Sequence, residues 1–170
     1  MTEPKRHKHS AGLLLFRRTT GGAERAATDP GDGIEVLLGH MGGPLWSGRD
    51  AGGWAIPKGE YGPQETPRDA ARREFTEEIG LPPPEGEYLP LGDVRLTSGK
   101  LVTIWAVEAD LDPALMVPGT FTMEWPPHSG REEEFPELDR VAWFAPPVAE
   151  KKLMASQMPF LERLLMLLKG

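Results

Sequence analysis

Short apolar runs separated by glycine-rich or polar stretches make up most of this 170-residue chain. Residues 13–16 and 34–38 form two such runs, and residues 19–33 between them are rich in Gly, Asp and Ala. This pattern predicts strand, loop and strand, most simply an antiparallel pair. A second glycine-rich loop leads to residues 54–56, which we expect to form one more short strand ended by Pro57.

The second half of the chain predicts further strands and an apolar helix. Residues 98–100 have the sequence Ser-Gly-Lys, a turn sequence between two strand-like runs, so we expect a β-hairpin over 91–109. Three kinds of segment follow it: strands over 121–125 and 141–144, a polar, glutamate-rich loop over 126–137, and an apolar helix over 160–168. We expect this last helix to pack on the sheet.

A helix near the middle of the chain has clear signals at both ends. Thr66 offers a capping hydroxyl, Pro67 stands at the first helical position, and Gly80 suits the C-terminal stop. The apolar residues recur every four positions and predict one buried stripe, formed by Ala71, Phe75 and Ile79. We therefore expect a helix that ends at about residue 79.

Several strands, one central helix and one terminal helix indicate an α+β fold, with a mixed sheet between helices. Gly (20 residues) and Pro (18 residues) are too frequent for a helical bundle. We expect residues 1–170 to form a single domain, with residues 1–10 as a loose terminus or the lead-in to a first strand. His7 and His9 are not expected to bind a metal, because nothing nearby completes a ligand set.

The composition excludes several classes of site. A net charge of −7 disfavours binding to a nucleic acid polymer. The same charge suits a cation site, although solubility is the simpler explanation. The absence of cysteine excludes disulfides, thiolate metal sites and cysteine nucleophiles. No apolar stretch reaches the roughly 18 residues of a membrane span, so we expect a soluble, cytoplasmic protein with no membrane partner.

Three carboxylates share one face of the central helix. Glu74, Glu77 and Glu78 stand at i, i+3 and i+4, where like charges destabilise a helix by a few tenths of a kcal/mol per pair. A cation between them would remove that cost, and oxygen ligands favour Mg²⁺ or Mn²⁺ over zinc. The alternative is a solvated acidic face paired with Arg72 and Arg73, and the spacing alone leaves both interpretations open.

Residues 59–81 resemble the Nudix box, G-x5-E-x7-R-E-U-x-E-E-x-G-U, in which U is a bulky aliphatic residue. Every defined position matches except the first U, where this chain has Phe75. Residues 54–59 resemble the W-x-x-P-K-G segment of dinucleoside polyphosphate hydrolases and related nucleotide pyrophosphohydrolases. Residues 137–143 resemble an E-x5-W segment of the same superfamily. The resemblance implies the Nudix fold.

The resemblance also implies roles for the residues of the box. A backbone carbonyl and carboxylates would hold Mg²⁺ or Mn²⁺, from Gly59, Glu74, Glu77 and Glu78. Of these, Glu77 would either bind the metal or hold a metal-bound water. Arg73 would orient the glutamates, and Glu65 would anchor the loop by a salt bridge to the helix.

The chemistry of diphosphate hydrolysis suggests further candidates. The nucleophile and the substrate are both anionic, so positive charge is needed at the phosphates. Lys58, next to Gly59, is the candidate to stabilise the leaving group, and its alternative is an exposed loop lysine.

Many family members use a glutamate from the last loop as general base or as a further metal ligand. Four glutamates lie close enough in the sequence: Glu132, Glu133, Glu134 and Glu137. We favour Glu134 and Glu137, and expect at least two of the four to be merely solvated.

The residues and the resemblance together predict metal-dependent hydrolysis of a phosphoanhydride bond in a nucleoside diphosphate-linked substrate. The expected partner is a small-molecule nucleotide, either a dinucleoside polyphosphate or a nucleoside triphosphate, with ADP-ribose less favoured. Four aromatic residues at loop edges are candidates to stack on its base: Trp46, Tyr61, Trp125 and Phe135. For each of them packing in the core is the favoured alternative, and the sequence does not choose among them. We expect a monomer or a homodimer.

The main alternative is a non-catalytic Nudix-fold module that binds a nucleotide. Such modules usually lose glutamates of the box, and this chain has all of them. An isomerase relative would need a cysteine, which is absent. An inositol pyrophosphate phosphatase would need a basic pocket, which the net charge does not indicate.

Overall fold

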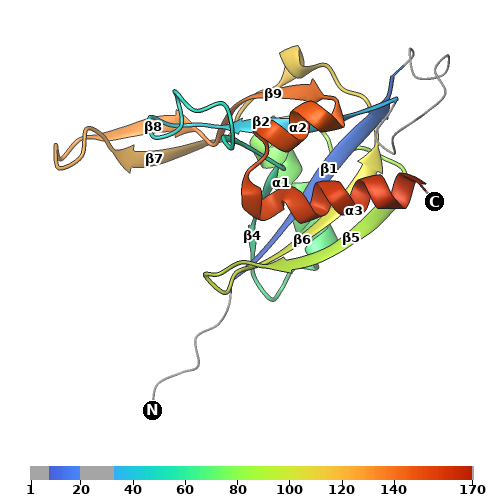
Figure 1. The fold of residues 1–170 in the computed structure, drawn as a ribbon. Coiled ribbons are helices and arrows are strands. Elements are labelled where there is room, and N and C mark those ends of the chain that lie inside the picture. The colour runs from blue at the N-terminus through green and yellow to red at the C-terminus, as the bar shows by residue number, and fades with distance from the viewer. Residues whose placement is uncertain (1–7, 20–32, 170) are drawn as a thin grey trace.

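A seven-stranded mixed sheet forms the centre of the protein in the computed structural model, which describes residues 8–19 and 33–169 (Figure 1). Five strands follow in the order β3 (Trp54–Ala55), β2 (Ile34–Met41), β1 (His9–Arg18), β6 (Leu101–Glu108) and β5 (Tyr88–Arg95). In addition, β4 (Lys58–Tyr61) pairs with β1, and β9 (Leu138–Phe144) pairs with β2. The β1–β6 pair is parallel and the other strand pairs are antiparallel.

Helices cover both faces of this sheet. One face packs against α1 (Pro67–Ile79), and the other against α2 (Pro146–Lys152) and α3 (Met158–Lys169) (Figure 1). Short 3₁₀ turns, η2 (Pro113–Leu115) and η3 (Ala155–Gln157), lie in the connections.

Strand β1 is buried on both sides. Leu13 and Leu15 belong to the apolar cluster that contains α1, whereas Leu14 and Phe16 belong to the cluster that contains α3. A strand with two buried faces needs apolar side chains at successive positions. This is why its sequence is a continuous apolar run and not an alternation.

The ends of α1 form as the sequence predicts. The Thr66 hydroxyl accepts a hydrogen bond from the Asp69 backbone N–H at 3.2 Å. At the other end Gly80 has φ 78°, and its N–H donates to the Thr76 carbonyl at 2.8 Å. Phe75 is fully buried in the stripe that faces the sheet. Both ends of the helix are thus fixed, and so is the direction of its acidic face.

A second, two-stranded sheet projects from the body of the protein (Figure 1). It consists of β7 (Thr120–Glu124) and β8 (Glu132–Pro136), with Thr122 opposite Glu134. The prediction of a polar loop over 126–137 is therefore wrong for residues 132–136. Their side chains are exposed or half-buried, so no continuous apolar pattern marked this strand.

The α+β fold, the mixed sheet between helices, the β1–β2 pair, the β5–β6 hairpin and the terminal helix are confirmed. Besides β8, three features differ from expectation: β1 already begins at His9, residues 58–61 form a strand, and α2 had no predicted counterpart. Residues 1–7 and 20–32, including His7 and most of the first predicted loop, lie outside the described residues. The single-domain organisation stays a prediction.

Replacing Gly80 with alanine is expected to destabilise the protein by about 1–2 kcal/mol or more. A Cβ at this position would be strained by the positive φ and would overlap with the Val117 carbonyl oxygen. Thermal unfolding should show a melting temperature lower by several degrees. The control is Gly48→Ala, where a Cβ meets no atom within 4 Å. Equal melting temperatures for the two variants would contradict this account of the helix end.

Candidate functional site

A cavity of about 580 Å³ lies where α1, β4 and the start of β9 meet. Its charged lining comes from four separate parts of the chain: Lys58 and Glu60 of β4, Glu74, Glu77 and Glu78 of α1, Lys100 of the β5–β6 turn, and Glu137 between β8 and β9. The fold therefore brings five carboxylates and two lysines to one place.

Glu74 lies directly against Gly59. A Cβ on Gly59 would overlap with the Glu74 carboxylate, so only glycine permits this approach. Gly59 is itself held opposite Ala11 in the β1–β4 pair. The Glu74 side chain is 12% exposed, and its burial raises the pKa of the carboxyl, while Arg73 opposes that shift.

Glu78 is the most strongly perturbed carboxyl in the cavity. Burial, together with the nearby charges of Glu74 and Glu137, raises its pKa to about 8. The Lys58 ammonium and a hydrogen bond from the Lys58 backbone oppose this shift without cancelling it. The cavity thus has more negative charge than its own lysines compensate.

Arg73 joins three glutamates of the box, Glu65, Glu74 and Glu77, to one another. Its guanidinium donates two hydrogen bonds to Glu65, at 2.7 and 2.8 Å. It also donates to Glu74 at 2.8 Å and to Glu77 at 3.1 Å. The bond from Arg73 lowers the pKa of Glu65. This geometry agrees with the expected roles, in which Arg73 orients the glutamates and Glu65 anchors the loop to the helix.

Glu77 differs from the other two box glutamates, because its side chain is 57% exposed and its carboxylate is held by Arg73. Within residues 8–19 and 33–169, no three histidine or acidic side chains converge into a ready-made metal site. The structure therefore brings together Gly59, Glu74 and Glu78, with Glu77 at the edge of the cavity.

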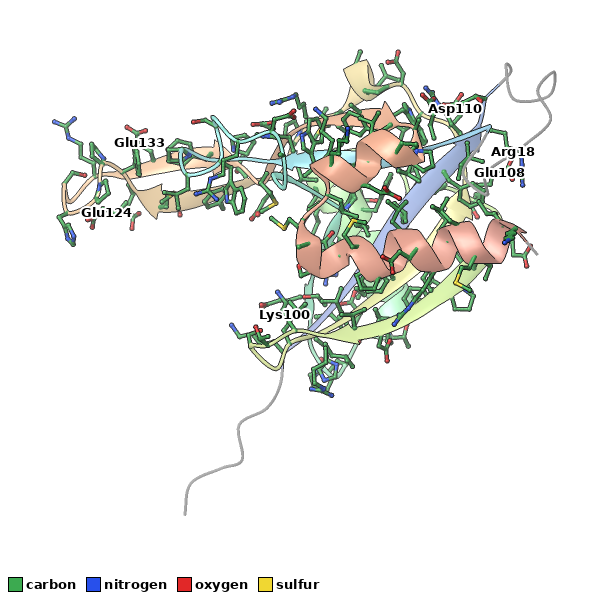
Figure 2. The ribbon with its side chains drawn as sticks, in the orientation of Figure 1. Arg18, Lys100, Glu108, Asp110, Glu124 and Glu133 are labelled. Atoms are coloured by element: carbon green, nitrogen blue, oxygen red, sulfur yellow. The ribbon has the colours of Figure 1, made fainter. Side chains whose placement is uncertain are left out.

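Two lysines face the carboxylates. Burial lowers the pKa of Lys58, and the charge of Lys100 lowers it further. Lys58 is thus not the exposed loop lysine of the alternative interpretation. Lys100 makes a 3.4 Å ion pair with Glu60 and lies at the β5–β6 turn, where Figure 2 labels it. Nothing in the local sequence marked Lys100, because only the folding of the hairpin brings it to the cavity.

The structure separates the two favoured loop glutamates. Glu137 lines the cavity, and its backbone N–H donates to the Gly119 carbonyl at 2.8 Å. Its carbonyl accepts a hydrogen bond from the Gly42 N–H at 2.9 Å. Glu134 is exposed on β8 and does not line the cavity. Its neighbour Glu133, labelled in Figure 2, lies out on the projecting hairpin.

The protein resembles known proteins in sequence. A family model for the NUDIX domain matches residues 26–164. An RNA pyrophosphohydrolase of Pseudomonas savastanoi pv. phaseolicola is 45% identical over 53 residues, which cover 31% of this chain and 33% of that protein. One from Pseudomonas putida is 41% identical over 61 residues, covering 35% of this chain and 38% of that protein. The matched segments span about a third of the length of these curated relatives.

Solved structures resemble it over nearly the whole chain. A Caenorhabditis elegans Ap4A hydrolase binary complex has a TM-score of 0.61 at 20% identity, covering 95% of this chain and 98% of that one. RenU, a Nudix hydrolase from M. smegmatis, has a TM-score of 0.55 at 26% identity and covers 95% and 85%. The NUDIX domain of Shewanella oneidensis NrtR with ADP ribose has a TM-score of 0.59 at 16% identity, covering 96% and 90%.

Among the described residues, no helix is long and apolar enough to cross a membrane.

Because the pKa of Glu78 is raised, the stability of the fold should depend on pH. The folded-state pKa of Glu78, about 8, lies above its ordinary value of 4.5, so this carboxyl stabilises the fold only while it is protonated. That contribution is complete below about pH 4.5 and is lost as the pH rises towards 8. Without divalent cations, Glu78→Gln should therefore melt several degrees above the wild type at about pH 8.5 and together with it at about pH 4.

The control for this comparison is Glu162→Gln, on the exposed side of α3, which should follow the wild type at every pH. If the melting temperature of Glu78→Gln at high pH is equal to or below that of the wild type, ionisation of the Glu78 carboxyl does not destabilise the fold.

Proposed function

The chain belongs to the Nudix family, and on that basis we propose that it is a hydrolase that cleaves a phosphoanhydride bond in a nucleoside diphosphate-linked substrate. The main support is that two carboxylates, Glu74 and Glu78, and two lysines, Lys58 and Lys100, line the same cavity. Carboxylates suit hard divalent cations, and ammonium groups suit phosphate oxygens.

The residues present fit Mg²⁺ or Mn²⁺. The donor set consists of oxygen atoms, from the carboxylates of Glu74 and Glu78 and the carbonyl of Gly59. The pKa values of both carboxyls are raised, mainly by burial, so a bound cation would stabilise their charged forms. Glu77 would join this set once its carboxylate leaves Arg73. When bound, the cation would neutralise phosphate oxygens and make a water molecule more acidic.

The other charged groups would act on the substrate directly. Lys58 and Lys100 would bind phosphate oxygens, and the partly desolvated Lys58 would stabilise charge on the leaving group. Glu137 would accept the proton of the attacking water, because it lines the cavity on a backbone fixed at both its N–H and its carbonyl. Arg73 is a positioning residue, since it holds Glu74 and Glu77.

Two substrate classes remain the main candidates. Similarity to an Ap4A hydrolase and to the W-x-x-P-K-G segment supports a dinucleoside polyphosphate, and the lysines of the cavity would also suit the phosphates of a nucleoside triphosphate. The RNA pyrophosphohydrolase relatives add the 5′-triphosphate end of RNA as a third candidate, although the net charge of −7 opposes a long RNA. A cytoplasmic location and a monomer or homodimer stay predictions.

Product analysis tests this proposal. Purified protein with Mg²⁺ or Mn²⁺ is incubated with diadenosine tetraphosphate, dNTPs, oxidised dGTP, ADP-ribose and a 5′-triphosphorylated oligoribonucleotide, and the products are separated by chromatography. Metal-dependent cleavage of one class would name the substrate. Tight binding of a nucleotide without any cleavage would instead support the non-catalytic module.

Glu78→Gln and Glu74→Gln are each expected to lower turnover by at least about 100-fold. Each change removes a negative ligand oxygen while keeping the shape of the side chain, so circular dichroism spectra should stay unchanged. A variant with wild-type turnover would show that the cation is not held by that carboxylate.

Glu137→Gln is expected to lower kcat by about 100-fold or more, the usual contribution of a general base. The matched control is Glu134→Gln, three residues earlier, which is exposed and outside the cavity and should retain wild-type kcat. If Glu134→Gln lowers kcat and Glu137→Gln does not, the general base is Glu134. If neither change lowers kcat, neither residue is the general base.

A further inference from the structure

A small apolar pocket lies next to the charged cavity and takes no part in the proposed hydrolysis. It has a volume of about 230 Å³, and the side chains that line it include Met41, Leu45, Trp46, Phe121, Met123 and Glu137. Leu45 is 63% exposed although it is a large apolar residue. The pocket is smaller than the roughly 300–1,000 Å³ of a typical site for a whole ligand. Its size therefore suits one apolar part of a larger molecule.

The pocket and the cavity are adjacent. Met41 and Glu137 line both of them, whereas Lys58 and Lys100 line the cavity alone. The combined site thus has a cationic part and an apolar part, with the carboxylates of α1 in the cavity. A ligand with phosphates in the cavity can place an uncharged ring in the pocket. This is the charge distribution of a nucleotide.

We propose that this pocket is the nucleobase subsite of the enzyme, with Trp46 as the stacking residue. The assignment rests on the proposed function and adds the direction in which the substrate lies: the base is against Trp46, and the phosphate chain runs past the α1 carboxylates towards Lys58 and Lys100.

The aromatic residues of the pocket are held in place by their neighbours. The Arg49 guanidinium lies over the Trp46 ring at 5.4 Å from its centroid, and Phe121 packs against Phe135 with ring centroids 6.1 Å apart. A preorganised ring loses little freedom when a base stacks on it. Of the four aromatic candidates from the sequence, this geometry selects Trp46, and Phe135 supports the pocket through Phe121.

The chemistry of the lining also sets the specificity. Glu137, the one charged residue of this lining, is shared with the cavity, so stacking and not hydrogen bonding dominates recognition of the base. We expect purines to bind better than pyrimidines, because they offer the larger stacking area, with little discrimination between adenine and guanine.

The test is calorimetric binding with two probes that share the phosphate chain, α,β-methylene-ATP and inorganic tripolyphosphate, both with Mg²⁺. The wild type should bind the nucleotide at least about fivefold more tightly than tripolyphosphate, the factor expected for one stacked base. Trp46→Ala should abolish this preference and leave tripolyphosphate affinity unchanged, while Trp46→Phe should retain part of it.

A matched pair of leucines provides the control. Leu45 and Leu115 are exposed to similar extents, 63% and 60%, but only Leu45 lines the pocket. Leu45→Ala should weaken nucleotide binding and Leu115→Ala should not.

Three outcomes would overturn the assignment. One is equal affinity of the wild type for both probes, which removes the subsite while the hydrolase proposal stands. Another is a Trp46→Ala variant that keeps the wild-type preference. The third is a dimer, seen by size exclusion, that Leu45→Ala dissociates without changing nucleotide affinity, which makes the pocket an interface. A wild type that binds neither probe and cleaves no nucleotide would refute the proposed function itself.

Discussion

The site depends on the burial of two carboxylates, Glu74 and Glu78, between α1 and β4. Each carboxylate would be more stable in water: burial raises the pKa of both groups, and the charge of Glu74 raises that of Glu78 further. The fold nevertheless keeps them there, because Ala71, Phe75 and Ile79 fix the opposite side of the helix in the core and the missing side chain of Gly59 leaves room for Glu74. A divalent cation would stabilise the charged forms of these carboxylates, and the proposed chemistry follows from that.

The remaining charges are arranged around this cluster. Arg73 compensates Glu65, Glu74 and Glu77 on the open side, and it fixes their direction through paired hydrogen bonds. Lys58 and Lys100 approach from β4 and from the β5–β6 turn. The charged cavity lies next to the apolar pocket at Trp46 and shares Met41 and Glu137 with it, so groups that suit the phosphates and the base of a nucleotide lie side by side.

Local signals in the sequence predicted much of this arrangement. Thr66, Pro67 and Gly80 define the ends of α1, and the spacing of its glutamates places them on one face. Features set by tertiary pairing were missed. β4 is four residues long with one glycine and two charged residues, so only its pairing with β1 makes it a strand. Lys100 reaches the cavity through a hairpin, and the choice of Glu137 over Glu134 depends on where β8 ends.

Calorimetric titration with Mn²⁺ shows whether the carboxylates of Glu74 and Glu78 form a divalent cation site. We expect saturable binding to the wild type that weakens at least about tenfold in both Glu74→Gln and Glu78→Gln and stays unchanged in Glu134→Gln. Equal binding by all four proteins, or no binding by the wild type, would contradict it. The acidic face of α1 would then not bind a cation, and the proposed metal-dependent hydrolysis at this site would be wrong.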